Sequence, residues 1–112
     1  MLFDPKWSPS KVELQDWQKI LLIAADILER EGWIQHKAIS NHGHCMAAAL
    51  WKAGSGGDTT KHALSPKEEE VYMMAREKLL ATIGGSIIIW NDHSGRTKKQ
   101  VVAKLKEAAR AL

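Results

Sequence analysis

Three short polar patterns mark helix starts along the chain. Each has Ser or Thr followed three residues later by Glu or Gln, so that the two side chains bond to free backbone N–H groups at a helix start. The pairs are Ser10 with Glu13, Ser65 with Glu68, and Thr97 with Gln100. Apolar residues at steps of three and four follow each pair, which is the pattern of a helix with one buried face. These patterns favour a helical bundle over a sheet protein.

Glycines and helix-forming residues set the other helix bounds. Gly32, Gly54 and Gly84 each follow a helical apolar pattern, and glycine is common directly after a helix. At 112 residues the chain has the length of a single domain. The sequence therefore predicts one all-α domain over residues 1–112, with a loosely packed N-terminal arm at 1–9. We expect a compact bundle of four main helices at about 10–31, 44–53, 65–83 and 97–111.

The apolar run before the last helix has an ambiguous pattern. Three isoleucines and a tryptophan at 87–90 favour an extended backbone. No other run in the chain alternates clearly between apolar and polar residues, so a strand here would lack a partner. We therefore expect a short buried connector at 86–92, either helical or extended, and no sheet.

Composition narrows the class of protein. Apolar residues make up 45% of the chain and charged residues 26%, which is typical of a folded globular domain. The single cysteine, Cys45, cannot form an intramolecular disulfide, and no apolar leader opens the sequence. No apolar run approaches the roughly 20 residues that span a bilayer. We expect a cytosolic protein without a membrane anchor.

Positive charge gathers at the end of the chain. Residues 1–95 contain 10 Lys or Arg and 12 Asp or Glu, whereas residues 96–112 contain 6 and 1. Such a basic cluster attracts phosphates or an acidic protein surface, although a solvated helix face has the same composition. One face of the last helix would carry Lys99, Ala103, Lys106 and Arg110. Nucleic-acid binding through this face is therefore an alternative function.

The turn before the last helix combines residue types that are common in binding sites. Asn91 and Asp92 side chains stabilise turns, so this turn has a purely structural explanation as well. That explanation leaves out Arg96, whose charge is unfavourable at the positive end of a helix. An anion would offset this penalty, and it would be either Asp92 or a bound phosphate or carboxylate. The sequence leaves both hypotheses open.

A group of His and Cys residues suggests two kinds of chemistry. His36, His42, His44 and Cys45 lie at positions 36–45, but their order matches no common zinc-site spacing, so we predict no metal site. A cysteine at a helix start can act as a nucleophile with a histidine as base, although buried cysteines are usually inert. An enzyme that uses Cys45, or Asp92 beside His93, is a second alternative.

Three stretches carry a family resemblance. They are GWIQHKA (32–38), HCMAAALWKA (44–53) and WNDHSGRTKKQVVAKLKEA (90–108). They resemble the signatures of a family of small uncharacterised proteins from bacteria and their phages, namely Gly-Trp, Cys-Ala-x-Gly-Ala-Leu, and Trp-Asn-Asp followed by Gly-Arg-Thr. Here Met46 and Ala48 stand where that family usually has Ala and Gly. The resemblance implies a shared site at positions 32, 33, 45, 90–92 and 95–97, and no particular chemistry.

The sequence as a whole predicts a non-enzymatic binding or regulatory domain. Five tryptophans support this function, because tryptophan is enriched at interfaces. We expect recognition of a protein partner or a small anionic ligand near the start of the last helix, without a cofactor. The predicted binding residues are Trp33, Trp90, Asn91, Asp92, Arg96, Thr97, Lys98 and Lys99. No pattern in the sequence specifies an oligomeric state.

Overall fold

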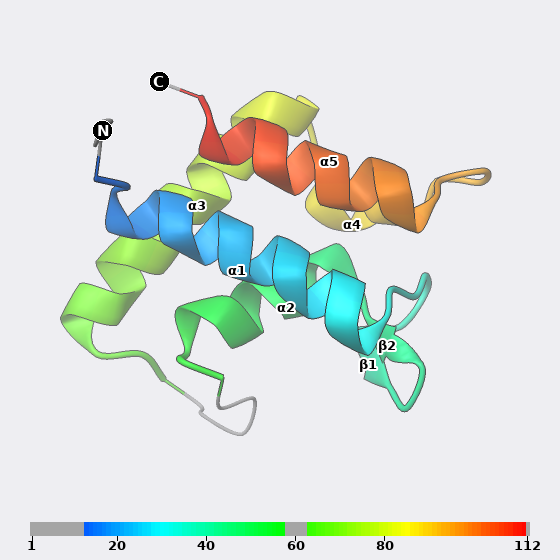
Figure 1. Ribbon diagram of the computed structural model, residues 1–112, viewed down its shortest axis with the longest axis horizontal. Helices are drawn as coiled ribbons and strands as arrows, with labels where there is room; N and C mark the ends of the chain where they lie inside the picture. The colour runs from blue at the N-terminus through cyan, green and yellow to red at the C-terminus, as the bar shows by residue number, and fades with distance from the viewer. Residues whose placement is uncertain (1–12, 58–62, 112) are drawn as a thin grey trace, which may run out of the picture.

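The all-α prediction is confirmed in outline. The computed structural model describes residues 13–57 and 63–111, and this part of the chain forms five helices and a two-stranded sheet (Figure 1). The elements are α1 (Asp16–Glu31), β1 (Ile39–Ser40), β2 (Gly43–His44), α2 (Met46–Gly54), α3 (Pro66–Ile83), α4 (Ile87–Asn91) and α5 (Lys98–Ala109). None of the described helices has the length and apolar character needed to cross a membrane.

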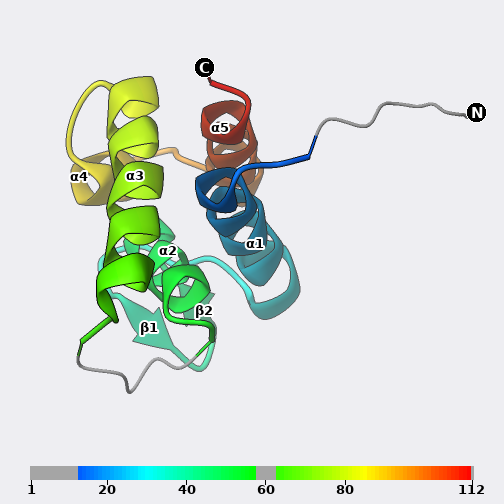
Figure 2. The same cartoon turned by 90° about the vertical axis from the view of Figure 1, so that its left-hand side faces the viewer.

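The helices pack around one apolar core. α1 and α5 lie side by side, α3 crosses them, and α2 with the small sheet lies at the α1 side of the molecule (Figures 1 and 2). Each fully buried leucine contributes about 1.5–3 kcal/mol to the free energy of unfolding. The largest fully buried apolar side chains are Leu21, Leu28, Met46, Leu50, Leu79, Leu105 and Val101.

Two helices begin where the sequence predicts. Ser65 Oγ accepts a hydrogen bond from Glu68 N at 3.2 Å, and Glu68 Oε1 accepts one from Ser65 N at 2.9 Å. Thr97 and Gln100 form the same reciprocal pair, at 3.2 Å and 3.0 Å. The starts of α3 and α5 are therefore confirmed, since both depend on contacts within one helical turn.

The predicted start of the first helix is wrong. α1 begins at Asp16, while the expected cap Ser10 and the arm at 1–9 lie outside the described residues. Gln18 Oε1 accepts a hydrogen bond from Gln15 N at 2.7 Å, and its Nε2 donates to Ala109 O at 2.9 Å. One side chain thus caps α1 and joins it to the end of α5, a distant contact that the local pattern could not reveal.

The small sheet corrects the expectation that no sheet forms. β1 and β2 are antiparallel, with Ile39 opposite His44 and Ser40 opposite Gly43, and Trp33 adds a parallel bridge to His44. Strands of two residues are too short for an apolar and polar alternation to appear.

The connector at 86–92 is helical, as one of the two expectations had it. Ser86 Oγ accepts a hydrogen bond from Ile89 N at 3.3 Å, which caps α4. Burial is only partial, because Ile87 is buried while Ile88 and Ile89 are 59% and 74% exposed. The prediction of a buried connector is therefore wrong for these two side chains.

Two glycines allow the backbone after α1 to touch the sheet. Gly32 has φ +103° and Gly43 has φ +143°, both unfavourable for residues with a side chain. A Cβ atom on Gly43 would lie 2.4 Å from Gly32 O, and one on Gly32 would lie 2.3 Å from His42 O. The close contact lets His44 N donate to Gly32 O at 3.1 Å, and Ile34 N to His44 O at 3.1 Å.

We expect Gly43→Ala to lower the free energy of unfolding by about 3 kcal/mol or more, because backbone strain and overlap with Gly32 add. Gly84→Ala is the matched control, since Gly84 has φ +82° and open space around it. We expect Gly84→Ala to lower the free energy of unfolding by about 1–2 kcal/mol, from backbone strain alone. Urea denaturation of both variants measures the difference. Equal losses would show that the Gly32 and Gly43 contact adds nothing to stability.

Candidate functional site

The buried amide of Asn91, at the end of α4, joins three segments of the chain. Asn91 is 0% exposed. Its Oδ1 accepts hydrogen bonds from Trp33 Nε1 at 2.7 Å and from Met46 N at 2.9 Å. Its Nδ2 donates to Ile34 O at 3.2 Å and to Asp92 Oδ1 at 2.9 Å. All four hydrogen-bonding positions of the amide are used, so α4, the start of α2 and the segment after α1 are fixed together.

The carboxylate of Asp92 continues this network to the surface. Asp92 Oδ1 also accepts a hydrogen bond from His36 N at 2.9 Å, and Oδ2 lies 3.8 Å from His36 Nδ1. The His36 backbone N–H and then the Asn91 side chain lower the pKa of Asp92 below its usual range. Asp92 therefore stays negatively charged at neutral pH. His36 itself has φ +70°, a backbone conformation that is uncommon outside glycine.

Arg96 lies on the ring of Trp90. Its Nε donates to Trp90 O at 2.9 Å, and its guanidinium carbon lies 3.7 Å from the Trp90 ring centroid. This stacking satisfies the cation by a cation–π contact. Over residues 13–57 and 63–111, Arg96 makes no ion pair, so the hypothesis of an Asp92 and Arg96 pair is wrong. Asp92 faces His36 instead, because that residue supplies a backbone donor from a distant segment.

The remaining predicted binding residues lie at the start of α5. Thr97 is occupied as the helix cap, and Lys98 Nζ donates to Glu29 O at 3.1 Å. Lys98, Lys99 and Lys106 line a pocket of about 530 Å³ that also includes Glu29. We call this pocket the lysine groove. The eight predicted residues thus do not form a single site: Trp33, Asn91 and Asp92 share a network, Trp90 and Arg96 stack together, and Lys98 and Lys99 line the groove.

A second pocket lies against the Asn91 network. It has a volume of about 550 Å³ and is bounded by residues 36–39, the first turns of α2, and α4. We call it the α2–α4 pocket. Most of its wall is apolar, and its apolar side chains are Ala38, Ile39, Ala47, Ala48, Trp51 and Ile88. Of the predicted residues, only Asn91 and Asp92 line it.

Two residues of the predicted Cys and His group, His36 and Cys45, also line the α2–α4 pocket. His36, Lys37 and Cys45 line the pocket together with Asn91 and Asp92. Cys45 caps α2, and its Sγ accepts a hydrogen bond from Ala48 N at 3.4 Å. Ile39, Trp51 and Ile88 were not predicted as site residues, because their place in the pocket depends on which side chains the fold leaves uncovered. The one signal in the sequence, for Ile88, was the apolar run at 87–90, which is longer than the buried face of a short helix requires.

His44 lies outside this pocket, in a cluster with Glu31 and Lys52. Glu31 Oε1 lies 2.7 Å from Lys52 Nζ and 3.6 Å from His44 Nε2. Burial lowers the pKa of His44, while the hydrogen bond from Lys52 lowers the pKa of Glu31. His44 Nδ1 is buried without a hydrogen-bond partner. Among the residues with a described position, no three His, Cys, Asp or Glu side chains are placed to hold a metal ion.

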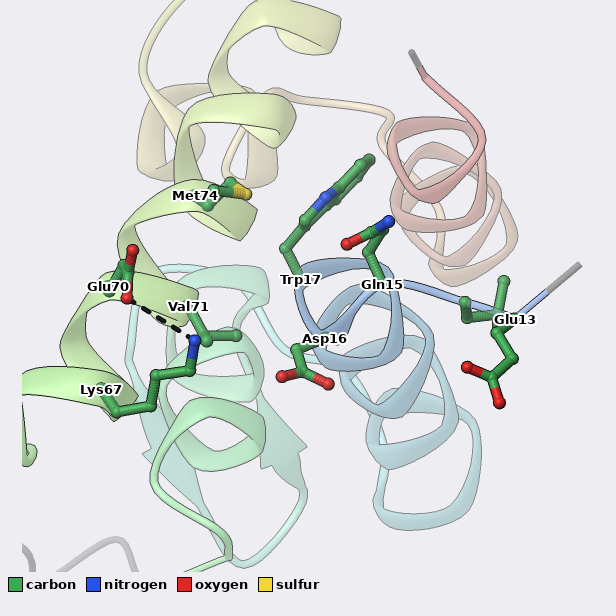
Figure 3. A pocket seen from close by; sticks show the side chains of 9 residues that line it. Glu13, Gln15, Asp16, Trp17, Lys67, Glu70, Val71 and Met74 are labelled. Carbon is green, nitrogen blue, oxygen red and sulfur yellow. Dashed lines mark ion pairs between the residues drawn. The ribbon is translucent and has the colours of Figure 1, made fainter.

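Another hollow lies between the starts of α1 and α3 and has a different character. Figure 3 shows Asp16 and Trp17 on one side of it and Lys67, Glu70 and Met74 on the other. It encloses about 250 Å³. Lys67 and Glu70 form an ion pair at 3.7 Å with both side chains mostly exposed, so their charges are screened by water. This hollow offers a ligand less apolar contact than the α2–α4 pocket.

We expect Asn91→Leu to lower the free energy of unfolding by at least about 3 kcal/mol. The substitution keeps the number of heavy atoms but removes the partner of Trp33 Nε1, Met46 N and Ile34 O, at about 1–3 kcal/mol each. Asn41→Leu is the control, since Asn41 is exposed and its replacement should cost less than about 1 kcal/mol. Urea denaturation measures both. Similar losses for the two variants would mean that the network does not hold the segments together.

Comparison with known proteins identifies a family. A family model described as a family of unknown function, DUF6197, matches residues 13–111. No curated protein and no solved structure matches the chain. The matched range includes every helix and strand, the Asn91 network and the α2–α4 pocket. The expected membership of a family without an assigned activity is thereby confirmed, and the chain belongs to DUF6197, a family of unknown function.

Proposed function

We propose that this protein is a non-enzymatic binding domain and that the α2–α4 pocket is its binding site. The observation that carries the proposal is a hollow of about 550 Å³ with mostly apolar walls and a few fixed polar groups. Small-molecule sites in proteins have this composition, with volumes of about 300–1,000 Å³. The ligand would place an apolar body in the pocket. A cytosolic setting and a bacterial or phage origin, both expected from the sequence, belong to this proposal.

Exposed apolar side chains at the pocket support ligand binding. Ile88 is 59% exposed although it follows the buried Ile87 on the same short helix. Ile39, which lines the same pocket from β1, is also exposed. Covering the exposed half of one such side chain contributes about 1 kcal/mol to binding. A ligand between β1 and α4 would gain this contribution from both walls.

The pocket walls are held before any ligand arrives. Asn91 fixes the end of α4 against Met46 at the start of α2. Cys45 N donates to Ala38 O at 2.8 Å, which fixes the segment before β1 to the same helix. A rigid site loses less conformational entropy on binding than a flexible one. The three walls are therefore suited to binding a small ligand without rearrangement.

The anionic ligand expected from the sequence would bind at the lysine groove or at Arg96, and both offer weaker support for binding than the α2–α4 pocket does. Arg96 is stacked on Trp90, and Lys98 donates to Glu29 O. The groove also contains the acidic side chain of Glu29. The nucleic-acid alternative rests on the exposed basic face of α5, which is common on helices that only contact water. We therefore place the proposed site at the α2–α4 pocket.

The neutral compound 4-phenylbutanol is a suitable probe of the pocket. At about 0.3 kcal/mol per non-hydrogen atom we expect a Kd of about 1–10 mM. Binding should shift the NMR signals of the Ala47 and Ala48 amides and of the Trp51 indole N–H. Ile88→Ser should weaken binding about fivefold by removing apolar wall. Ile89→Ser is the matched control, because Ile89 is 74% exposed and does not line the pocket. Absence of shifts, or equal effects of both variants, would contradict the proposal.

Catalysis by Cys45 is the second candidate function, and one observation favours it. Cys45, His36 and Asp92 all line the α2–α4 pocket, and Asp92 lies 3.8 Å from His36 Nδ1. A carboxylate, a histidine and a thiol can together activate a nucleophile. However, no hydrogen bond joins Cys45 to His36 in the described part of the chain. Cys45 is also only 8% exposed.

Alkylation by iodoacetamide separates the two functions. In this reaction the Cys45 sulfur forms a bond to carbon, iodide leaves, and the thiol proton passes to a base. If Cys45 only caps α2, we expect it to react more slowly than glutathione at pH 7, since a buried thiol is inert. A catalytic Cys45 would react faster than glutathione, and His36→Asn, which tolerates the positive φ, would slow it. Mass spectrometry of the native protein over time measures both rates.

A further inference from the structure

We infer that the α2–α4 pocket binds protonated organic amines with an apolar body, and that Asp92 receives the amine. This inference rests on the proposed function and names the class of its ligand. Asp92 lines the pocket, and its side chain is 25% exposed. It is the one acidic side chain among the residues that line this pocket. The ligand inferred here is a cation, whereas the sequence led us to expect an anionic one.

One oxygen of Asp92 remains available to a ligand. Oδ1 accepts from His36 N at 2.9 Å and from Asn91 Nδ2 at 2.9 Å. Oδ2 has a single described contact, with His36 Nδ1 at 3.8 Å, which is longer than a hydrogen bond. The two bonds to Oδ1 therefore hold the carboxylate in position without using Oδ2. An ammonium group in the pocket can donate to Oδ2 by a charge-assisted hydrogen bond.

The carboxylate and the apolar wall are placed for one ligand. Ile88 and Asp92 are four residues apart at α4, so their Cβ atoms lie on the same side, about 5–6 Å from each other. Ile39 and Trp51 add apolar surface from β1 and α2. An amine joined to an aromatic or aliphatic body by a short chain can reach Oδ2 while its body covers Ile88.

The other charged groups at this pocket act on a ligand less strongly than Asp92 does. Lys37 is exposed, and no hydrogen bond or ion pair holds its side chain within the described segments, so water screens its charge. The side chain of His36 is 72% exposed. Asp92 is held by two hydrogen bonds, and they lower its pKa, so its carboxylate is charged at neutral pH and fixed in position. The pocket should therefore prefer cations to anions.

Three compounds with a phenyl group on a four-carbon chain test the inference: 4-phenylbutylamine, 4-phenylbutanol and 4-phenylbutyrate. Titrations followed at the Ala47 and Ala48 amides give the three affinities for the native protein. We expect the amine to bind about tenfold more tightly than the alcohol, and the carboxylate to bind most weakly. The three affinities are compared on the native protein, so this test does not depend on the stability of a variant. Equal affinities, or tightest binding of the carboxylate, would overturn the inference while the proposed function stands. If none of the three shifts these amides, both fail.

Asp92→Asn identifies the group that recognises the amine. The asparagine retains an oxygen for the His36 N–H but removes the negative charge. We expect the preference for the amine over the alcohol to disappear, because the amine loses the negative charge that attracts it. Asp16→Asn, at the start of α1, removes the same charge outside the pocket and should leave the tenfold preference intact. An amine preference that survives Asp92→Asn would overturn the assignment.

Discussion

The hydrogen bonds of one buried side chain, Asn91, set the arrangement of the rest of the structure. A buried amide is costly unless its donors and acceptors are satisfied, and Asn91 satisfies three of its four hydrogen-bonding positions with groups from two distant segments. These partners are Trp33 and Ile34 after α1, and Met46 at the start of α2. Apolar packing alone would permit small shifts between these segments. The directional bonds to one amide fix their positions relative to α4.

Successive residues of α4 face different surroundings as a consequence. With the end of the helix fixed by Asn91, Ile87 is buried in the core and Trp90 packs under Arg96. Ile88 and Asp92 are left at the wall of the α2–α4 pocket. A stretch that begins as an apolar run and ends in polar residues thus contributes to the core, to the stacking on Arg96 and to the wall of a pocket within two helical turns. The pocket exists because the network determines which side chains remain uncovered.

Sequence predicted the features that depend on neighbouring residues and missed those that depend on distant ones. The caps at Ser65 and Thr97 each involve residues three positions apart, and both helix starts are confirmed. The start of α1 depends on Gln18, which also contacts the end of α5, and was wrong. Trp33 and Asn91 were expected in one site, and a hydrogen bond joins them across 58 positions. The exposed wall of the pocket could not be predicted, because exposure is decided by the whole fold.

Local placement of charge, rather than net charge, determines what this protein attracts at a given surface. The chain carries a net charge of +3, concentrated in α5, yet the α2–α4 pocket presents the fixed carboxylate of Asp92. At physiological salt, charges more than about 8–10 Å apart are largely screened in water. Asp92 lines the pocket and no residue of α5 does, so a ligand inside it would interact more strongly with Asp92 than with the exposed lysines of α5. Because the Asn91 network positions that carboxylate, the same side chain that organises the fold also places the charge on which the proposed amine binding depends.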